Sequence, residues 1–221
     1  MKFTAFNNLL LLSSILFLCF CSSTSLHNKR EFDLSFFNHT DSIIIELPKE
    51  KNGEISNQYL LKKMREKSAG LSSLENGFDS IKMRFWYRYG YNDTIQIIEI
   101  ANSCKKWAAS QCDIKCNFTN DYDTFICGEK TVINSDPKSG WENFIQKLLN
   151  ANILRLSGYE SYYANATDVS SVGVEIATKH RYMFYVFFEP LHDKNSLGAK
   201  SMVEIMDLIE DEFKFKRKER F

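Results

Sequence analysis

Within residues 79–103, side chains along the nine residues 81–89 alternate strictly between two faces, one apolar and one mostly polar. Successive side chains leave opposite faces of a β-strand, so this alternation predicts a strand. One face of it carries Ile81, Met83, Phe85, Tyr87 and Tyr89. The other face carries Lys82, Arg84, Trp86 and Arg88, and we expect that face to meet solvent or a partner. Together with turn-forming residues at 90–93, the stretch predicts a β-hairpin.

Further strands are predicted where β-branched and aromatic residues lie between turn formers. They cover residues 42–47, 94–101, 107–118, 124–134, 173–178 and 181–188. Sequential strands with short connections usually pair as antiparallel neighbours. We therefore expect a four-stranded meander from about residue 80 to 134, and a second hairpin that turns at Lys179 and His180.

Two amphipathic segments provide cover for the apolar face of this sheet. In residues 139–151, Ser139 and Glu142 fit a capping box, and apolar residues then recur at helical spacing. Residues 196–213 carry a wider apolar stripe with the same period. A shorter helix fits residues 56–68, whose basic side chains indicate a solvated helix face, with contact to phosphate or anionic lipid as the alternative.

The order strands, helix, strands, helix lacks the βαβ alternation that is typical of parallel sheets. It predicts an α+β fold, with an antiparallel sheet built from the meander and the second hairpin. Both amphipathic helices are expected on one face of that sheet. The single domain is expected at residues 41–215, followed by a basic tail at 216–221. A chain of 221 residues less a leader has the length of one ordinary domain.

A succession of four stretches along the chain carries a family resemblance. They are residues 73–86 (SLENGFDSIKMRFW), 139–156 (SGWENFIQKLLNANILRL), 173–185 (GVEIATKHRYMFY) and 204–215 (EIMDLIEDEFKF). Together they resemble a group of uncharacterised exported proteins and lipoproteins of Bacteroidetes-type bacteria. The resemblance implies a shared fold and an exported location. That group has no assigned activity, catalytic residue or ligand, so it implies no chemistry.

The N-terminus has the pattern of an export signal. Lys2 gives a small positive start, and residues 9–20 (LLLLSSILFLCF) form an apolar run. A permanent membrane crossing needs about 20 apolar residues, so this run is short for a span and suits the core of a signal peptide. We expect a signal peptide at residues 1–20 and export of the remaining chain.

The end of that signal, residues 18–21 (LCFC), resembles the lipobox of bacterial lipoproteins, with a polar Ser/Thr stretch after it. The resemblance implies that Cys21 is acylated and that residues 21–40 tether the domain to a membrane of the cell envelope. Phe20 departs from the pattern, which prefers a small residue just before the cysteine. Acylation of Cys19, ordinary cleavage after Ser25 with a periplasmic or secreted product, and an uncleaved anchor are the alternatives.

The charges of the chain bear on its partners. Its 28 basic residues balance its 28 acidic residues, so no net field attracts a polyanion, and we predict no nucleic-acid partner. Trp and Arg are common at binding hot spots, which makes Arg84, Trp86 and Arg88 a candidate interaction surface. The alternative is a solvated sheet face with the tryptophan covered by a loop.

Four cysteines lie in the predicted domain, at positions 104, 112, 116 and 127. An even number in an exported chain favours disulfides, with free thiols or a metal site as alternatives. If the turn is centred between Asp121 and Tyr122, Cys116 and Cys127 face each other across a hairpin. Cys104 and Cys112 would then close a short loop. Four cysteines allow three connectivities, so the sequence leaves the pairing open.

No catalytic motif stands out in the sequence: the four histidines fit no known pattern, and we predict no catalytic residue, metal or cofactor. Two hypotheses follow. The first is a lipid-anchored envelope protein that binds a protein or polymer partner through its sheet face or through residues 158–171. The second is an exported hydrolase-type enzyme. A plain secreted or immunity-type protein is a further alternative.

Overall fold

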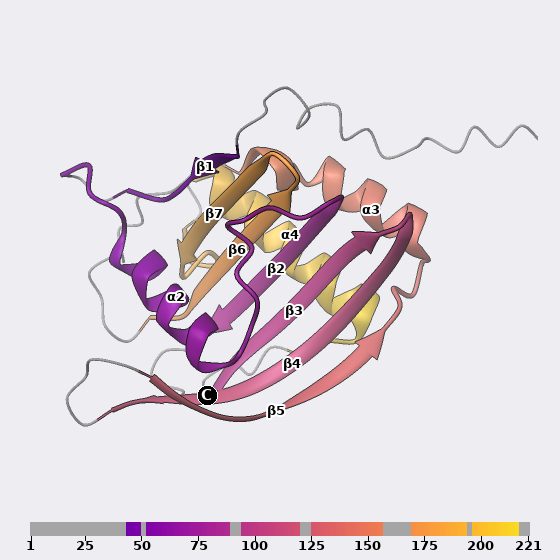
Figure 1. Cartoon of the computed structure of the whole chain (residues 1–221). Coiled ribbons are helices and arrows are strands. Elements are labelled where there is room, and N and C mark those ends of the chain that lie inside the picture. The colour runs from indigo at the N-terminus through magenta and orange to yellow at the C-terminus, as the bar shows by residue number, and fades with distance from the viewer. Residues whose placement is uncertain are drawn as a thin grey trace, which may run out of the picture. The chain divides into compact units, whose positions relative to one another are not determined.

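The computed structural model describes residues 43–49, 52–88, 94–119, 125–156, 169–193 and 196–216. Within these ranges the protein has an α+β fold with one seven-stranded sheet and three α-helices (Figure 1). The helices are α2 (Asn57–Ser68), α3 (Trp141–Asn150) and α4 (Leu197–Phe213), with a short 3-10 helix, η2 (Ile153–Arg155). The strands are β1 (Ile44–Glu46), β2 (Ile81–Arg88), β3 (Thr94–Ser103), β4 (Lys106–Phe118), β5 (Phe125–Ser135), β6 (Ser171–Thr178) and β7 (Arg181–Phe188).

The strand order in the sheet is β1-β7-β6-β2-β3-β4-β5. The predicted meander is present, because β2, β3, β4 and β5 pair in sequence as antiparallel neighbours. The predicted hairpin of β6 and β7 is also present, and β6 joins the meander by pairing with β2. Both pairings place Arg84 of β2 between Glu99 of β3 and Glu175 of β6.

The sheet is mixed, whereas the sequence had led us to expect a wholly antiparallel sheet. The first strand, β1, pairs in parallel with β7, with Ile44 opposite Arg181. The expectation came from a rule about neighbours in sequence. It fails here because β1 and β7 lie far apart along the chain. The strand is also shorter than the predicted residues 42–47.

The three helices cover opposite faces of the sheet (Figure 1). The helices α3 and α4 lie together on one face, as predicted from their apolar stripes, and the rings of Phe144 and Phe213 meet edge to face at 5.0 Å. They cover the apolar side of β2, where Ile81 and Phe85 are completely buried. The other face is covered by α2, which the predicted two-helix arrangement did not include.

One local prediction on the α3 side is wrong. Gly140 precedes the helix with φ of 80° and no side-chain cap, so Ser139 does not form the expected capping box. Instead, the backbone N–H of Ser139 donates to Glu212 of α4 at 2.7 Å, a tertiary contact that takes the place of a local one. The chain after α3 continues into the short 3-10 helix η2.

Some predictions fall outside the described ranges. These are the signal peptide at residues 1–20, the acylated Cys21 and its tether, the turn at 90–93, and most of the loop at 158–171. In the part of the chain that the structure describes, none of the helices combines the length and the apolar character that a bilayer crossing requires.

Candidate functional site

The polar face of β2 lies beneath α2. Arg84 is completely buried and Trp86 is 6% exposed, whereas Arg88 is partly buried. The expectation that this face meets solvent is therefore wrong, and Arg84 and Trp86 do not form an exposed contact surface. Two groups of apolar side chains flank the polar centre. Tyr59 of α2 belongs to one of them, and Leu61 and Met64 pack against the other.

The helix α2 is positioned by its own ends and by these contacts. The Ser56 side chain accepts a hydrogen bond from the Gln58 backbone N–H, which satisfies a donor that the first helical turn leaves unpaired. At its other end, the Ala69 N–H donates to the carbonyl of Arg65, and Gly70 follows with φ of 61°. The helix thereby presents its buried positions Lys62 and Glu66, one turn apart, to the sheet.

Arg84 lies at the centre of a set of charged residues, which we call the Arg84 cluster: Lys62, Glu66, Arg84 and Glu175, which are buried, and Glu99, which is partly exposed. Its Nη1 atom donates to Glu66 Oε1 at 2.6 Å and to Glu175 Oε2 at 3.3 Å. Its Nε and Nη2 atoms donate to Glu99 Oε2 at 3.0 and 2.9 Å. Nη2 also donates to the carbonyl of Ser72 at 3.0 Å. The guanidinium therefore bridges α2, β3 and β6.

Glu175 is the main acceptor of the cluster and is completely buried. Its Oε1 atom accepts from Lys62 Nζ at 2.9 Å and from the Tyr182 hydroxyl at 2.8 Å. Its Oε2 atom accepts from Trp86 Nε1 at 2.6 Å, in addition to Arg84. A buried carboxylate is costly unless opposite charges and hydrogen bonds compensate for its lost hydration, and here two cations and two neutral donors do so.

Burial and neighbouring charges shift the pKa values of several groups in and beside the cluster. Burial, reinforced by the charge of Glu175, raises the pKa of Glu66 above its ordinary value, against the opposing effect of Lys62 and Arg84. Burial would lower the pKa of Arg84, but the surrounding carboxylates, led by Glu175, outweigh it and raise that pKa. Burial and Glu175 raise the pKa of Tyr182 far above its ordinary value, so its hydroxyl stays a donor. The arrangement holds α2 on the sheet.

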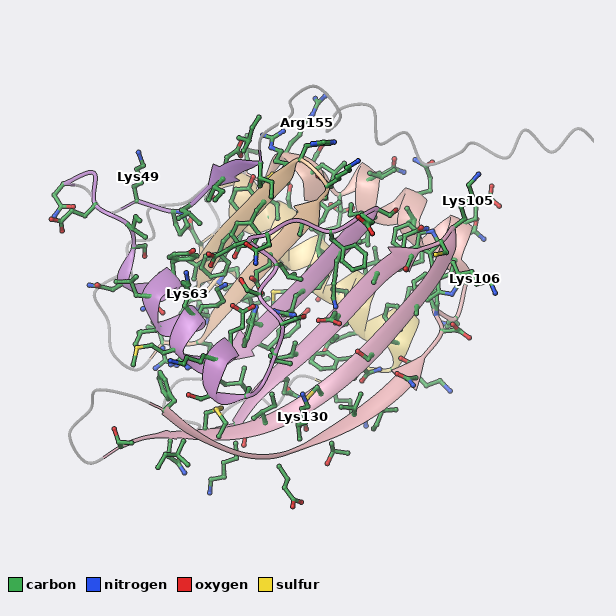
Figure 2. The ribbon with its side chains drawn as sticks, in the orientation of Figure 1. Lys49, Lys63, Lys105, Lys106, Lys130 and Arg155 are labelled. Atoms are coloured by element: carbon green, nitrogen blue, oxygen red, sulfur yellow. A yellow bond between two sulfur atoms is a disulfide. The ribbon has the colours of Figure 1, made fainter. Side chains whose placement is uncertain are left out.

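Further ion pairs lie between the Arg84 cluster and the protein surface. Lys63, labelled in Figure 2, pairs with Glu75 at 3.0 Å. Glu75 also accepts from the Tyr59 hydroxyl at 2.5 Å. Lys82 pairs with Glu99 at 2.5 Å, which connects the cluster to the surface. Lys62 is thus buried among carboxylates instead of lying on the solvated helix face expected for it, whereas Lys63 stays exposed beside its partner Glu75.

The cysteines give one disulfide. Cys116 and Cys127 lie opposite one another in β4 and β5 and are bonded, which confirms the pairing expected from the position of the turn. Cys104 and Cys112 are free, so the predicted disulfide between them is wrong. Cys104 lies in the β3–β4 turn beside Lys105 and Lys106, which Figure 2 labels. The six steps from Lys106 to Cys112 span about 20 Å, far beyond the Cα separation that a disulfide permits.

Among the residues that the structure describes, no three His, Cys, Asp or Glu side chains gather closely enough to hold a metal ion.

Comparisons of this chain with models of protein families, with curated proteins and with solved structures found no match.

The outer edge of the sheet is formed by β5, an eleven-residue strand that pairs with β4 along one side. Figure 1 shows it curving along the side of the sheet opposite to β1 and β7. No other described strand pairs with its outer side. Three large apolar side chains on it are exposed: Ile126 (66%), Val132 (52%) and Ile133 (59%). Val132 and Ile133 are neighbours, so they lie on opposite faces of the strand.

Sequence reasoning missed Lys62, Glu66 and Glu175 as members of a site. One signal was available for Glu175, which interrupts the apolar run VGVEIA at residues 172–177. A single carboxylate in a strand that is buried on both faces needs a cationic partner, and Arg84 and Lys62 were both present in the sequence. Which cation would meet it depended on the strand order.

Proposed function

We propose that this chain is an exported, lipid-anchored protein of the cell envelope that acts by binding a partner protein and not by catalysis. The anchor is supported by the apolar run at residues 9–20 and by the LCFC sequence that ends in Cys21. The binding role is supported by the exposed apolar edge strand β5. This strand is the single observation on which the proposed binding role depends.

The edge of β5 has the properties of a strand-addition site. An edge strand offers unpaired N–H and C=O groups to another extended chain, and native proteins usually shield such edges with short strands, charges or prolines. In β5 the exposed charges Glu129 and Lys130 shield only the middle of the edge, and Ile126, Val132 and Ile133 remain exposed on either side of them. We propose that an extended segment of the partner adds to β5, with hydrogen bonds from its main chain and with apolar side chains over Val132 and Ile133.

The buried charges favour binding over the hydrolase alternative. Glu66 and Glu175 are each held in ion pairs with Arg84 and Lys62 beneath α2. A carboxylate that acts as a general base must reach the proton that it abstracts. These two carboxylates are directed at cations of the same chain, which suits a role in fixing α2 to the sheet.

The anchor is tested by the intact mass of the protein purified from its native membrane fraction. We expect the mass of a chain that begins at Cys21 with acyl groups attached. A soluble chain that begins at Leu26 would refute the anchor and would make a secreted or periplasmic protein the better proposal.

The binding edge is tested by site-specific photo-crosslinking in the native envelope. A crosslinking residue at position 133 should give a defined adduct, and Ile126→Lys in the same chain should abolish it by placing a charge on the edge. Position 197 is the matched control, because Leu197 is an 80% exposed apolar residue at the start of α4. Equal adducts from positions 133 and 197, or an adduct unaffected by Ile126→Lys, would contradict the proposal.

A further inference from the structure

A small cavity of about 30 Å³ lies between α2 and the sheet, beside the Arg84 cluster. Its polar lining comes from Gln58, Lys62 and Arg65 of α2, from Arg88 of β2 and from Ser171 of β6. Of the described residues that line it, three are cations and none is a carboxylate. About 10–15 Å³ admits one water molecule, so the space suits a group of only a few heavy atoms.

Glycine at position 173 helps to keep this space open. A Cβ atom built on Gly173 would lie 3.0 Å from Cε2 of Phe184 and 3.5 Å from Cβ of Trp86, two other residues that line the cavity. Any larger side chain would therefore have to move the Phe184 ring or enter the cavity. Trp86 and Phe184 thus give the cavity an apolar wall in addition to its cations.

Arg65 is the unusual member of this lining. It is only 9% exposed, and its guanidinium lies 4.4 Å from the centre of the Phe125 ring. Among the described residues, no side chain accepts a hydrogen bond from it or pairs with its charge. Burial and the nearby positive charge of Arg88 lower the pKa of Arg65 to about 10.

The comparison with Arg84 shows what Arg65 lacks. Both arginines are buried between α2 and the sheet, yet Arg84 is matched by Glu66, Glu99 and Glu175. A buried guanidinium without a counter-charge costs free energy, and a second guanidinium nearby adds repulsion. An anion in the cavity would relieve both costs, since a planar guanidinium is well suited to bind a carboxylate through two parallel hydrogen bonds.

We propose that this cavity binds one small carboxylate, held by the guanidinium of Arg65, with the charge of Arg88 and the hydroxyl of Ser171 beside it. The volume limits the ligand to a carboxylate with a short chain, and the wall of Trp86 and Phe184 takes the apolar end of that ligand. This site goes beyond the proposed function, because it depends on neither the lipid anchor nor the β5 edge.

The experiment uses the full chain and sodium acetate as the probe, with sodium chloride at the same ionic strength as the reference. In thermal unfolding at pH 7, acetate should raise the transition temperature of the wild-type protein in a concentration-dependent way, because a ligand of the folded state stabilises it by mass action. Calorimetric titration with acetate then gives the dissociation constant directly.

Arg65→Gln is the decisive variant, and Lys67→Gln is its control, since Lys67 is an exposed cation two residues further along α2. Loss of the charged hydrogen bonds should weaken acetate binding roughly tenfold or more in Arg65→Gln and leave it unchanged in Lys67→Gln. Without acetate, Arg65→Gln should be at least as stable as the wild-type protein, because it removes an unmatched buried charge. If Arg65 had a merely structural role, Arg65→Gln would instead be less stable than the wild-type protein in the absence of acetate.

Three outcomes would overturn the proposal. They are no effect of acetate beyond that of chloride, an acetate effect that persists in Arg65→Gln, and a larger stabilisation by phosphate than by acetate. If Arg65→Gln fails to fold, Gly173→Ala provides the second test, because its methyl group crowds the cavity without altering any charge. None of these results bears on acylation or on crosslinking at position 133, so the two proposals fail separately.

Discussion

The ammonium of Lys62 donates to the Oε1 atom of Glu175 at 2.9 Å, across a separation of 113 residues in the chain. Both side chains are buried, with Lys62 3% exposed and Glu175 completely enclosed. This contact joins the helix α2 to the strand β6 in the middle of the sheet. The local sequence patterns had instead predicted that Lys62 of α2 lies on a solvated helix face and that the polar face of the sheet meets solvent or a partner.

Replacing Glu175 by Gln should strongly destabilise the protein. The substitution removes the negative charge that compensates Lys62 and Arg84, and removal of one member of a buried ion pair costs about 3–5 kcal/mol. Unfolding in urea, followed by tryptophan fluorescence, measures the difference. Glu129→Gln on the exposed part of β5 is the control and should change stability by less than about 0.5 kcal/mol. Equal stabilities of the two variants would contradict this account of the cluster.

The free cysteines should differ sharply in reactivity. Cys104 is exposed, whereas Cys112 is buried and burial raises the pKa of its thiol. The thiolate is the reactive form, so iodoacetamide should label Cys104 in the native protein and Cys112 only after unfolding. Peptide mass spectrometry without reductant should also recover Cys116 and Cys127 as one linked pair. Labelling of Cys116 in the native, unreduced protein would show that this disulfide is absent.

Glu212 should contribute to stability in a pH-dependent manner. Burial would raise its pKa, but hydrogen bonds from Lys147 and the Ser139 backbone outweigh burial and hold the pKa of Glu212 below its ordinary value of 4.5. Unfolding then takes up a proton, so the stabilisation is present above about pH 4.5 and is lost as the pH falls through the folded-state pKa. Glu212→Gln should therefore lower the free energy of unfolding at pH 7, and the gap to wild type should narrow toward pH 3.

The neighbouring residue provides the control for that measurement. Asp211 pairs with Lys138 on the surface, where both side chains are about two-thirds exposed. Exposed pairs of this kind are worth about 0–1 kcal/mol, so Asp211→Asn should follow the wild-type pH profile closely. A gap for Glu212→Gln that stays constant from pH 7 to pH 3 would show that its carboxylate contributes no linked proton.

Gly77 should tolerate no side chain. It has φ of 81°, and an added Cβ would lie 2.9 Å from the carbonyl oxygen of Thr178. Gly140 has φ of 80° with open space around it, so Gly140→Ala incurs only the backbone strain of about 1–2 kcal/mol. Gly77→Ala incurs the same strain and a backbone collision as well, and should lower the melting temperature further. A smaller loss for Gly77→Ala than for Gly140→Ala would contradict the close approach to Thr178.

The sequence by itself determined the elements that depend on neighbouring residues. Alternation with period two located β2, and apolar spacing with the helical period located α3 and α4. The symmetry of a turn aligned Cys116 with Cys127. Each of these patterns reflects side chains that lie within one or two turns or one hairpin of each other, so it can be read along the chain.

Only the tertiary structure decided what the polar face of β2 does. Arg84 resembles a solvated residue in the local pattern, and its three carboxylate partners come from α2, β3 and β6. The parallel pairing of β1 with β7 is likewise invisible in any local window. Buried charges are tolerated only where opposite charges meet them, and the strand order brings those charges together from distant parts of the chain. For this reason neither the Arg84 cluster nor the unmatched Arg65 beside it could be recognised before the fold was known.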